Sequence, residues 1–308
     1  MGLSRHILLA ASTNPWLRER AVRTSFVRRS VARFMPGEHV EDALAAAVRM
    51  RDRRTATILT QLGENVTGRD EAEAVTRHYL DLIDRIAAAG LDAHISVKPT
   101  QLGFDLDREL CKDNLTRLTT RAGARGQTVW LDMESAAYVD ATLQLVRDAA
   151  EGPAVVGVAL QAYLYRTPGD LESLLPLRVA IRLVKGAYLE TASVAYPKRS
   201  DVDEQYYRLA CRALSARAGG GAVVHLATHD VRVIEKLVAY VTEQRVPIET
   251  FEFAMLYGIR VPLQRQILES GRRLRVLISY GEHWFPWYMR RLAERPANLW
   301  FVARSILR

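Results

Sequence analysis

The sequence predicts an α/β protein: a closed (βα)8 barrel of the TIM type with an N-terminal helical extension. Eight short runs rich in Val, Ile, Leu or Thr alternate along the chain with longer amphipathic stretches. Strands that alternate with helices pair in parallel, and eight such units suit a closed barrel. Unusual polar residues also cluster where several of these runs end. An open, doubly wound sheet is the alternative.

The strand candidates are bounded by Gly, Pro or charged residues, as short buried strands usually are. They cover Thr55–Gln61, His94–Lys98, Thr128–Met133, Val155–Ala162, Val179–Lys185, Ala222–Thr228, Ile248–Phe253 and Leu274–Tyr280. The helix candidates between them include Glu71–Ala89, Arg108–Arg121, Ala136–Ala150, Asp203–Ala218 and Arg232–Gln244. Around the last of these, apolar residues recur at spacings of three and four from Val231 to Val241, which indicates one buried helix face.

Both ends of the chain carry further helical patterns. Residues 1–50 are predicted to form a helical extension that packs against the barrel, and residues 51–308 to form the barrel itself. Trp287–Glu294 is expected to be the last barrel helix, with Leu299–Leu307 as a terminal helix. No linker, low-complexity segment or repeat interrupts the chain.

The composition is typical of one large soluble domain, such as an α/β barrel, or of two smaller ones. Of the 308 residues, 49% are hydrophobic and 25% are charged. No apolar run approaches the length that spans a bilayer, and Ile7–Ala11 is too short for a signal peptide. Cys111 and Cys211 are too few for a disulfide framework, so the expected location is the reducing cytoplasm.

The net charge of +8 is scattered, with local clusters at Arg18–Arg33, Arg49–Arg54 and Arg272–Arg275. No nucleic-acid-binding motif accompanies it, so no nucleic-acid partner is predicted. The histidines lack metal-ligand spacing, and neither G-x-G-x-x-G nor the Walker pattern occurs. A metal site and a Rossmann or P-loop nucleotide site are therefore not expected. Attraction to an acidic membrane surface stays open.

One predicted strand ends in an unusual way. The apolar run Val179–Val184 is followed by Lys185, Gly186 and Tyr188, which supply a cation, a flexible backbone and a phenol. A buried strand has no packing reason to end like this. Because ligands bind at the carboxyl ends of strands in α/β proteins, we expect a site for an anionic, aromatic-sized partner. Arg182 within the run must be paired or must reach a ligand.

Other predicted strands bring polar groups to the same mouth. Each of these groups also has a purely structural interpretation. Lys98 could be a solvated loop lysine. Asp132 and Glu134, and likewise His229 and Asp230, could cap the helices that follow them. Gln161 is harder to explain in this way, because an amide at the end of an apolar strand needs partners. The convergence of all these ends favours a binding site more than any single residue does.

Two adjacent arginines, Arg290 and Arg291, lie on the last predicted helix. They could belong to an ordinary surface helix, where Glu294 is spaced to pair with them. Alternatively, they could form a bidentate clamp for a carboxylate beside the barrel mouth.

These residues together resemble the signature of the proline dehydrogenase family, and the length resembles that of its single-function bacterial form. The motifs follow one another in order over nearly the whole chain: Ser96-Val97-Lys98, Leu131-Asp132-Met133-Glu134, Gln161-Ala162-Tyr163, Arg182–Tyr188, Ala227–Asp230, Phe251-Glu252-Phe253 with Met255-Leu256-Tyr257-Gly258, and Arg290–Pro296. The resemblance implies a distorted (βα)8 barrel that binds FAD and oxidises L-proline to Δ1-pyrroline-5-carboxylate. It implies hydride transfer to the flavin and a membrane quinone as electron acceptor.

The resemblance also assigns roles to residues. It implies that Asp132, Arg182 and Tyr188 are catalytic, with Arg182 beside the flavin. Cofactor-binding roles are implied for Met133, Gln161, Arg182, Lys185, Gly186, Ala187, Thr228, His229 and Glu252. Substrate-binding positions are implied to be Lys98, Leu256, Leu277, Trp287, Arg290, Arg291 and Glu294.

Four positions depart from the family pattern. Leu277 and Trp287 stand where the family has tyrosines, Ala254 where it has glutamine, and Pro99 where it has leucine. The carboxylate clamp is kept while the wall around the substrate changes. We therefore expect a small cyclic amino acid as substrate, either proline or a related cyclic or modified amino acid.

Two other functions remain as alternatives. One is a Schiff-base aldolase that uses Lys98 or Lys185, and the other is a non-catalytic member that only binds flavin or an amino acid. With a quinone as acceptor, the expected location is the cytoplasm, with peripheral contact at the inner face of the membrane.

Overall fold

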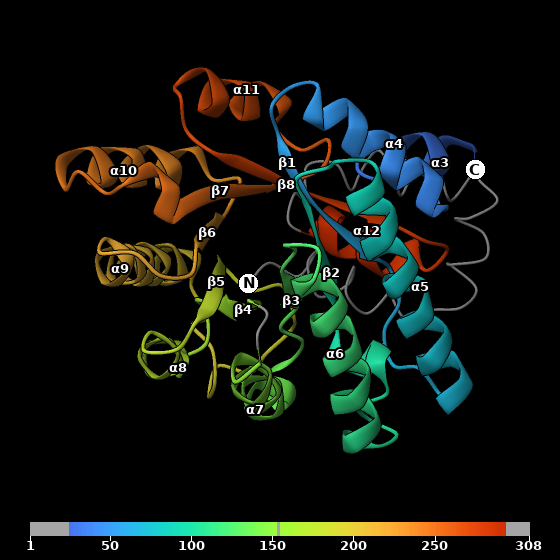
Figure 1. Cartoon of the computed structure of the whole chain (residues 1–308). Coiled ribbons are helices and arrows are strands. Elements are labelled where there is room, and N and C mark those ends of the chain that lie inside the picture. Colours follow the sequence, from blue (N-terminus) through green and yellow to red (C-terminus); the bar gives the residue numbers. More distant parts are fainter. Residues whose placement is uncertain (1–24, 153–154, 294–308) are drawn as a thin grey trace.

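The computed structural model describes residues 25–152 and 155–293, and it contains a closed barrel of eight parallel strands (Figure 1). The strands pair in chain order, and β8 closes the barrel by pairing with β1. This confirms the predicted (βα)8 class over the open sheet. The strands are β1 (Ala56–Gln61), β2 (Ala93–Val97), β3 (Val129–Leu131), β4 (Val156–Gln161), β5 (Val179–Val184), β6 (Val224–Ala227), β7 (Phe251–Leu256) and β8 (Leu274–Tyr280).

The α-helices lie around the outside of the strands (Figure 1). They are α3 (Ser25–Val31), α4 (Val40–Arg51), α5 (Arg69–Ala88), α6 (Arg108–Gly123), α7 (Val139–Ala150), α8 (Thr167–Leu174), α9 (Arg199–Arg217), α10 (Val231–Glu243), α11 (Val261–Glu269) and α12 (Trp284–Ala293). Short 3-10 turns are η1 (Pro99–Leu102), η2 (Ala136–Tyr138) and η3 (Ile248–Thr250). Within the described residues, none of the helices is long and apolar enough to cross a membrane.

The predicted elements match the observed ones closely except at β7, at α7 and at α12, which begins at Trp284 rather than at the predicted Trp287. The prediction began this strand at Ile248, but residues 248–250 form the turn η3 and the strand runs from Phe251 to Leu256. Pro247 precedes the turn and has no N–H for a sheet ladder, and the side chain of Ile248 is exposed. The predicted helix at Ala136–Ala150 is likewise a turn, η2, followed by α7.

The described part of the N-terminal extension consists of α3 and α4. Helix α4 packs against β1 and β8, and its buried alanines Ala43, Ala46 and Ala47 share the main hydrophobic core with Leu59 of β1. The boundary at residue 50 stays a prediction. The helices predicted within residues 1–24 and at Leu299–Leu307 lie outside the described residues.

Each strand has an outward face and an inward face, because successive side chains alternate. On β3, Val129 and Leu131 join the core between the sheet and the helices, whereas Trp130 joins a separate interior cluster with Ile58 and Ala180. Inward positions on later strands are polar, among them Arg182 and His225, which are register partners in β5 and β6. The barrel interior is therefore filled by both apolar and charged side chains.

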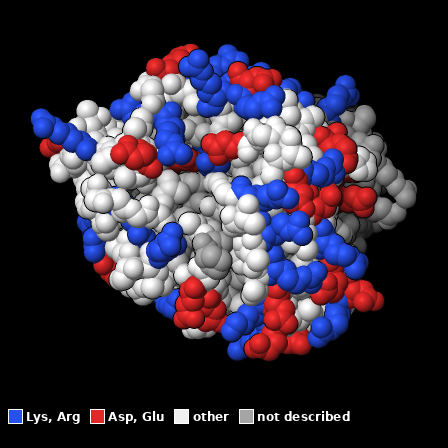
Figure 2. Space-filling model, viewed as in Figure 1, with Lys and Arg blue, Asp and Glu red and all other residues white. Residues whose placement is uncertain are grey.

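The surface carries charges of both signs. Figure 2 shows lysine and arginine side chains interleaved with aspartates and glutamates over the visible face. Many are ion pairs between neighbouring helices, such as Arg117 with Glu73 at 2.8 Å and Arg121 with Asp84 at 2.7 Å. Exposed pairs of this kind contribute little to stability.

Candidate functional site

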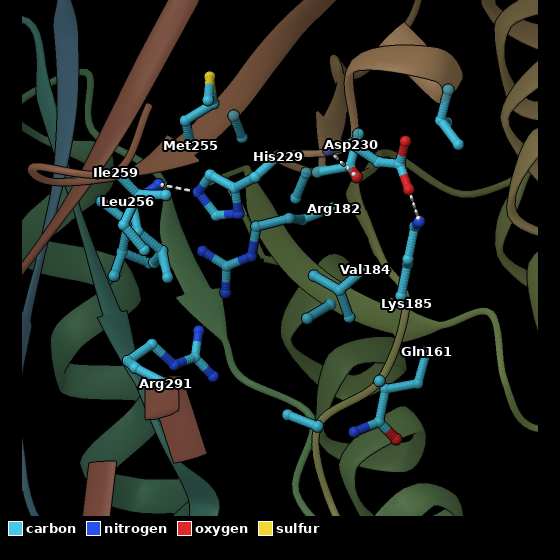
Figure 3. Close-up of a pocket in the computed structure, with 18 of the residues that line it drawn as sticks. Gln161, Arg182, Val184, Lys185, His229, Asp230, Met255, Leu256, Ile259 and Arg291 are labelled. Atoms are coloured by element: carbon cyan, nitrogen blue, oxygen red, sulfur yellow. Dashed lines mark hydrogen bonds and ion pairs between the residues drawn. The ribbon is translucent and has the colours of Figure 1, made fainter. Parts of the chain in front are cut away.

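A cavity of about 1910 Å³ opens at the carboxyl ends of the strands. It is lined by most of the residues that the sequence singled out, although they come from seven different strands or their loops and from α12. These residues are Lys98, Asp132, Met133, Gln161, Arg182, Lys185, Gly186, Ala187, Tyr188, Thr228, His229, Leu256, Leu277, Trp287, Arg290 and Arg291. Figure 3 shows Arg182, His229, Leu256 and Arg291 around one open space within it. The predicted convergence of strand ends on a single mouth is thus present.

Asp132 lies at the centre of a charge cluster at the ends of β2, β3 and β5. Its Oδ2 atom accepts a hydrogen bond from Lys98 Nζ at 2.9 Å, and its Oδ1 atom accepts one from Ser96 Oγ at 2.8 Å. Arg182 Nη2 also donates to Oδ1. Burial by itself would raise the pKa of Asp132, but Lys98 and Arg182 outweigh it and lower the pKa to about 2. Asp132 is therefore an anion that holds two cations in place.

Lys98 remains protonated in this setting. Burial opposes its charge, but Asp132 and Glu64 reverse the effect and raise the pKa of Lys98 above its ordinary value. A Schiff-base lysine needs the opposite, a lowered pKa that frees the amine. The geometry therefore favours a role for Lys98 as a fixed cation rather than as the nucleophile of an aldolase.

Arg182 is 4% exposed, so its charge must be compensated inside the barrel. Its Nη2 atom is satisfied by Asp132 and by Ser96 Oγ at 3.0 Å. Its Nη1 atom is buried and has no hydrogen-bond partner among the described residues. A buried donor without a partner is costly, which makes this atom available to a ligand in the cavity.

Gln161 shows the same combination of satisfied and open atoms. Its Nε2 atom donates to the backbone oxygen of Glu134 at 3.1 Å, which fixes the amide at the end of β4. Its Oε1 atom is buried without a partner in the described part of the chain. Together with Arg182, it gives the cavity one unused acceptor and one unused donor.

The structure requires glycine at position 186 for a different reason from the one that the sequence indicated. Its backbone has φ +113°, and a Cβ atom would overlap the ring of Tyr163. The glycine is thus required by the protein's own packing, not only by the approach of a ligand. Beside it, Lys185 Nζ binds two carboxylates, Asp203 and, at 2.8 Å, Asp230 (Figure 3).

His229 and Asp230 show that capping and site functions can coexist. Asp230 Oδ1 accepts from the backbone N–H of Arg232 at 3.2 Å, so the expected helix cap on α10 is present. His229 Nε2 accepts from the backbone N–H of Leu256 at 2.9 Å, which leaves the proton of the neutral ring on Nδ1 (Figure 3). By contrast, Asp132 does not cap the helix after β3, because it is committed to Lys98 and Arg182.

Glu134 is turned away from helix capping as well. It accepts hydrogen bonds from Thr100 Oγ1 at 2.8 Å and from Thr100 N at 3.3 Å, and it is 4% exposed. Burial raises the pKa of Glu134 to about 7. The N–H of Ala136 is instead taken by Glu190 Oε1 at 2.7 Å.

The paired arginines of α12 reach the cavity. Arg290 Nη2 donates to Glu64 Oε1 at 2.7 Å, and its guanidinium lies 5.7 Å from the ring centroid of Tyr188. Arg291 lies 6.0 Å from the ring centroid of Trp287. The arginines therefore face the barrel mouth rather than only solvent. Glu294, predicted to pair with them, lies outside the described residues.

Glu64 was not predicted from the sequence. It follows β1 by three residues, just as other site residues follow their strands. The rule that polar residues at strand ends face the mouth, applied to β1, identifies it.

The structure does not support the cofactor-binding role that the resemblance implied for Glu252, because this residue does not line the cavity. It is the second residue of β7 and lies toward the opposite end of the barrel, where its Oε2 atom accepts from Arg275 Nε at 2.6 Å. It is 1% exposed and also pairs with Arg273. The family resemblance implied a cofactor-binding role for Glu252, and because the prediction placed β7 three residues too early, it did not show that Glu252 lies at the start of this strand.

Comparisons with known proteins identify the family of this chain. A sequence model of the family described as "Proline dehydrogenase" matches residues 43–304. The chain is 38% identical to "Proline dehydrogenase" of Deinococcus radiodurans over 281 residues, 90% of this chain and 89% of that protein. It is 35% identical to "Proline dehydrogenase 1" of Bacillus subtilis subsp. natto over 304 residues, 99% of each chain.

Solved structures of lower identity share the fold. Proline utilization A (PutA) from Bdellovibrio bacteriovorus, inactivated by N-propargylglycine, matches with a TM-score of 0.82 at 23% identity, covering 96% of this chain and 37% of that one. PutA from Corynebacterium freiburgense matches with a TM-score of 0.76 at 20% identity, covering 94% and 34%. The chain spans little more than a third of these longer proteins. On its sequence, the chain belongs to the proline dehydrogenase family and is therefore an oxidoreductase.

Proposed function

We propose that this protein oxidises L-proline, or a related cyclic or modified amino acid, by hydride transfer to a bound FAD. Oxidation of proline gives Δ1-pyrroline-5-carboxylate. The observation that carries the proposal is that Arg182 lines the same cavity as the cations Lys98, Arg290 and Arg291 and has a buried Nη1 atom without a hydrogen-bond partner among the described residues. Membership of the proline dehydrogenase family supports it independently.

FAD fits the chemistry of the cavity. The volume of about 1910 Å³ exceeds what a small amino acid needs, which leaves room for a large cofactor. Gln161 Oε1 and Arg182 Nη1 offer one acceptor and one donor, and a flavin ring carries both kinds of group along its edge. When bound, FAD would supply the hydride acceptor, while the protein supplies position, dryness and charge.

We assign the cofactor contacts to the inner part of the cavity. Met133, Gln161, Thr228 and His229 would contact FAD, and Arg182 would lie beside its ring. Lys185, Gly186 and Ala187 would follow the cofactor's tail. Because Lys185 is already bound by Asp203 and Asp230, this end suits the hydroxyl groups of an adenosine better than a phosphate.

We assign the substrate to the cations. Two arginines and a lysine form a multi-donor site for a carboxylate, and Lys98 is already fixed by Asp132. Asp132 would orient the cluster, Tyr188 and Leu256 would line the pocket, and Glu294 would pair with the clamp. Arg290 is held by Glu64 at 2.7 Å, so binding of a carboxylate would replace one anionic partner by another.

Leu277 and Trp287 widen the proposed substrate range. Both line the cavity, and Leu277 offers no hydroxyl to a substrate. A pocket with fewer fixed polar partners discriminates less strongly against substituents on a substrate ring. Ring-substituted relatives of proline are therefore included in the proposal.

A quinone in the membrane is proposed as the electron acceptor, with the protein in the cytoplasm and in peripheral contact with the membrane. The net charge of +8 supports attraction to an acidic lipid surface.

The test is optical. The purified protein is examined for the visible spectrum of a bound flavin, and cyclic amino acids are then added without oxygen. Bleaching by L-proline or a ring-substituted relative is expected. A colourless protein that FAD cannot reconstitute would contradict the cofactor, and a flavin that no amino acid bleaches would indicate a non-catalytic binding protein.

A further inference from the structure

Trp130 occupies the barrel interior directly behind Arg182. The Cζ atom of Arg182 lies 5.1 Å from the centroid of the indole, which places the cation over the ring. The indole also lies against His225, with ring centroids 4.3 Å apart and an interplanar angle of 32°. Trp130 and His225 are fully buried.

Gly157 leaves the space that the indole ring of Trp130 occupies. This glycine of β4 is the register partner of Trp130, and a Cβ atom at this position would overlap the six-membered ring of the indole. Ala180, the register partner of Gly157 on β5, is also small and packs in the same interior cluster. The indole Nε1 atom has no hydrogen-bond partner among the described residues, so packing alone fixes the position of the ring.

The indole also stabilises the buried positive charge of Arg182. Burial penalises the charge of Arg182 and lowers its pKa, although Asp132 opposes this effect. The face of an aromatic ring attracts a cation most strongly where water is excluded. Asp132 and Ser96 accept hydrogen bonds from Nη2 of the guanidinium, and the ring of Trp130 lies beneath its Cζ atom.

His225 completes the arrangement without adding charge. Burial, together with Arg275 and Arg182, lowers the pKa of His225 well below its ordinary value, so its ring is neutral. Its Nε2 atom lies 3.4 Å from Glu252 Oε2. A neutral ring packs against the indole and does not repel Arg182.

We propose that Trp130 is a positioning residue for Arg182. Its indole packs against Gly157 and fixes the guanidinium of Arg182 at the cavity. This inference rests on the proposed function, in which Arg182 lies beside the flavin. A fixed positive charge there stabilises an anionic reduced flavin. Displacement of the guanidinium is therefore expected to lower the reduction potential of the flavin and to slow hydride transfer.

The central variant is Trp130→Leu, compared with the parent holoenzyme. We expect a more negative flavin midpoint potential and a kcat reduced about tenfold, with KM changed less than about twofold, because the substrate clamp is left intact. Trp130→Phe keeps a smaller aromatic face and should lie between the two. This split between kcat and KM separates positioning from a general loss of binding.

Gly157→Ala tests the position of the same indole ring from the neighbouring strand, β4. The added Cβ atom should push the indole from Arg182 and reproduce the lowered potential. Trp130→Phe in the Gly157→Ala background should recover part of the loss, because the smaller ring leaves room for the methyl group. Phe253→Leu is the matched control: it removes a fully buried aromatic ring that does not line the cavity, so stability should fall while the potential stays at the parent value.

A Trp130→Leu holoenzyme with the parent's potential and kcat would overturn the inference. If Trp130→Leu fails to fold, Trp130→Phe and Gly157→Ala carry the same comparison. If the parent binds no FAD, the proposed function fails, and a crystal structure of the variant decides the inference separately. A displaced Arg182 would support it, and an Arg182 still in its parent position on Asp132 and Ser96 would overturn it.

Discussion

Lys98 Nζ lies 2.9 Å from Asp132 Oδ2, at the ends of the adjacent strands β2 and β3. The same carboxylate binds Arg182 from β5. One anion therefore fixes two cations from different strands at the mouth of the barrel. The proposed substrate and flavin sites share this carboxylate, so a change at Asp132 should affect stability and activity together.

Asp132→Asn should lower the free energy of unfolding by about 3 kcal/mol at pH 7, because it leaves two buried cations without their anion. The folded pKa of Asp132, about 2, lies below its ordinary value of 3.8. The stabilisation is therefore present above about pH 4 and is lost as the pH falls toward 2. Urea unfolding of both proteins at several pH values measures this difference. A gap that stays constant down to pH 2 would contradict the assignment.

Glu134 should have the opposite effect on the pH dependence of stability, and Glu134→Gln should remove that effect. The folded pKa of Glu134, about 7, lies above its ordinary value of 4.5, so ionisation favours the unfolded state. The parent should lose about 3 kcal/mol of stability as the pH rises from 4.5 to 7, and Glu134→Gln should not. The exposed Glu151→Gln serves as the control and should follow the parent. Parallel stability curves for parent and Glu134→Gln would refute this prediction.

Gly186→Ala should destabilise the protein by about 2 kcal/mol, because the new Cβ atom meets the Tyr163 ring and the backbone has φ +113°. Gly219→Ala is the matched control, since a Cβ atom there has no neighbour within 4 Å. Thermal and urea unfolding of the two variants measure the contrast. Equal stability of both would show that the Tyr163 contact relaxes freely.

Leu277→Tyr should restrict the substrate range. A tyrosine adds volume and a hydroxyl to the cavity wall, and we expect the ratio of kcat/KM for proline over that for a ring-substituted analogue to rise about tenfold. Steady-state kinetics with both substrates measure the ratio, and the flavin spectrum checks that the variant is loaded. An unchanged ratio would mean that Leu277 does not face the substrate.

The convergence of Lys98, Asp132 and Arg182 could be predicted from the sequence. Each residue ends or lies near the end of a strand, and the carboxyl ends of parallel strands necessarily meet at one mouth. The position of Glu252 could not be predicted in this way. A three-residue shift of β7, imposed by the turn after Pro247, moves that residue to the other end of the barrel.

The purpose of Gly186 also depended on tertiary structure. A glycine after a strand suggests close approach of a ligand, but only the folded chain brings the ring of Tyr163 against it. Similarly, the sequence does not indicate that Trp130 meets Gly157, since this contact depends on the register between β3 and β4.

The sequence by itself determined the alternation of strands and helices, and hence the barrel and the mouth where its polar residues gather. Local patterns suffice for this, because hydrophobic periodicity and parallel pairing act along the chain. Tertiary structure decided which polar atoms are paired and which are left for a ligand. Those outcomes depend on strand register, burial and the distances between residues far apart in sequence, such as Arg182 and Trp130.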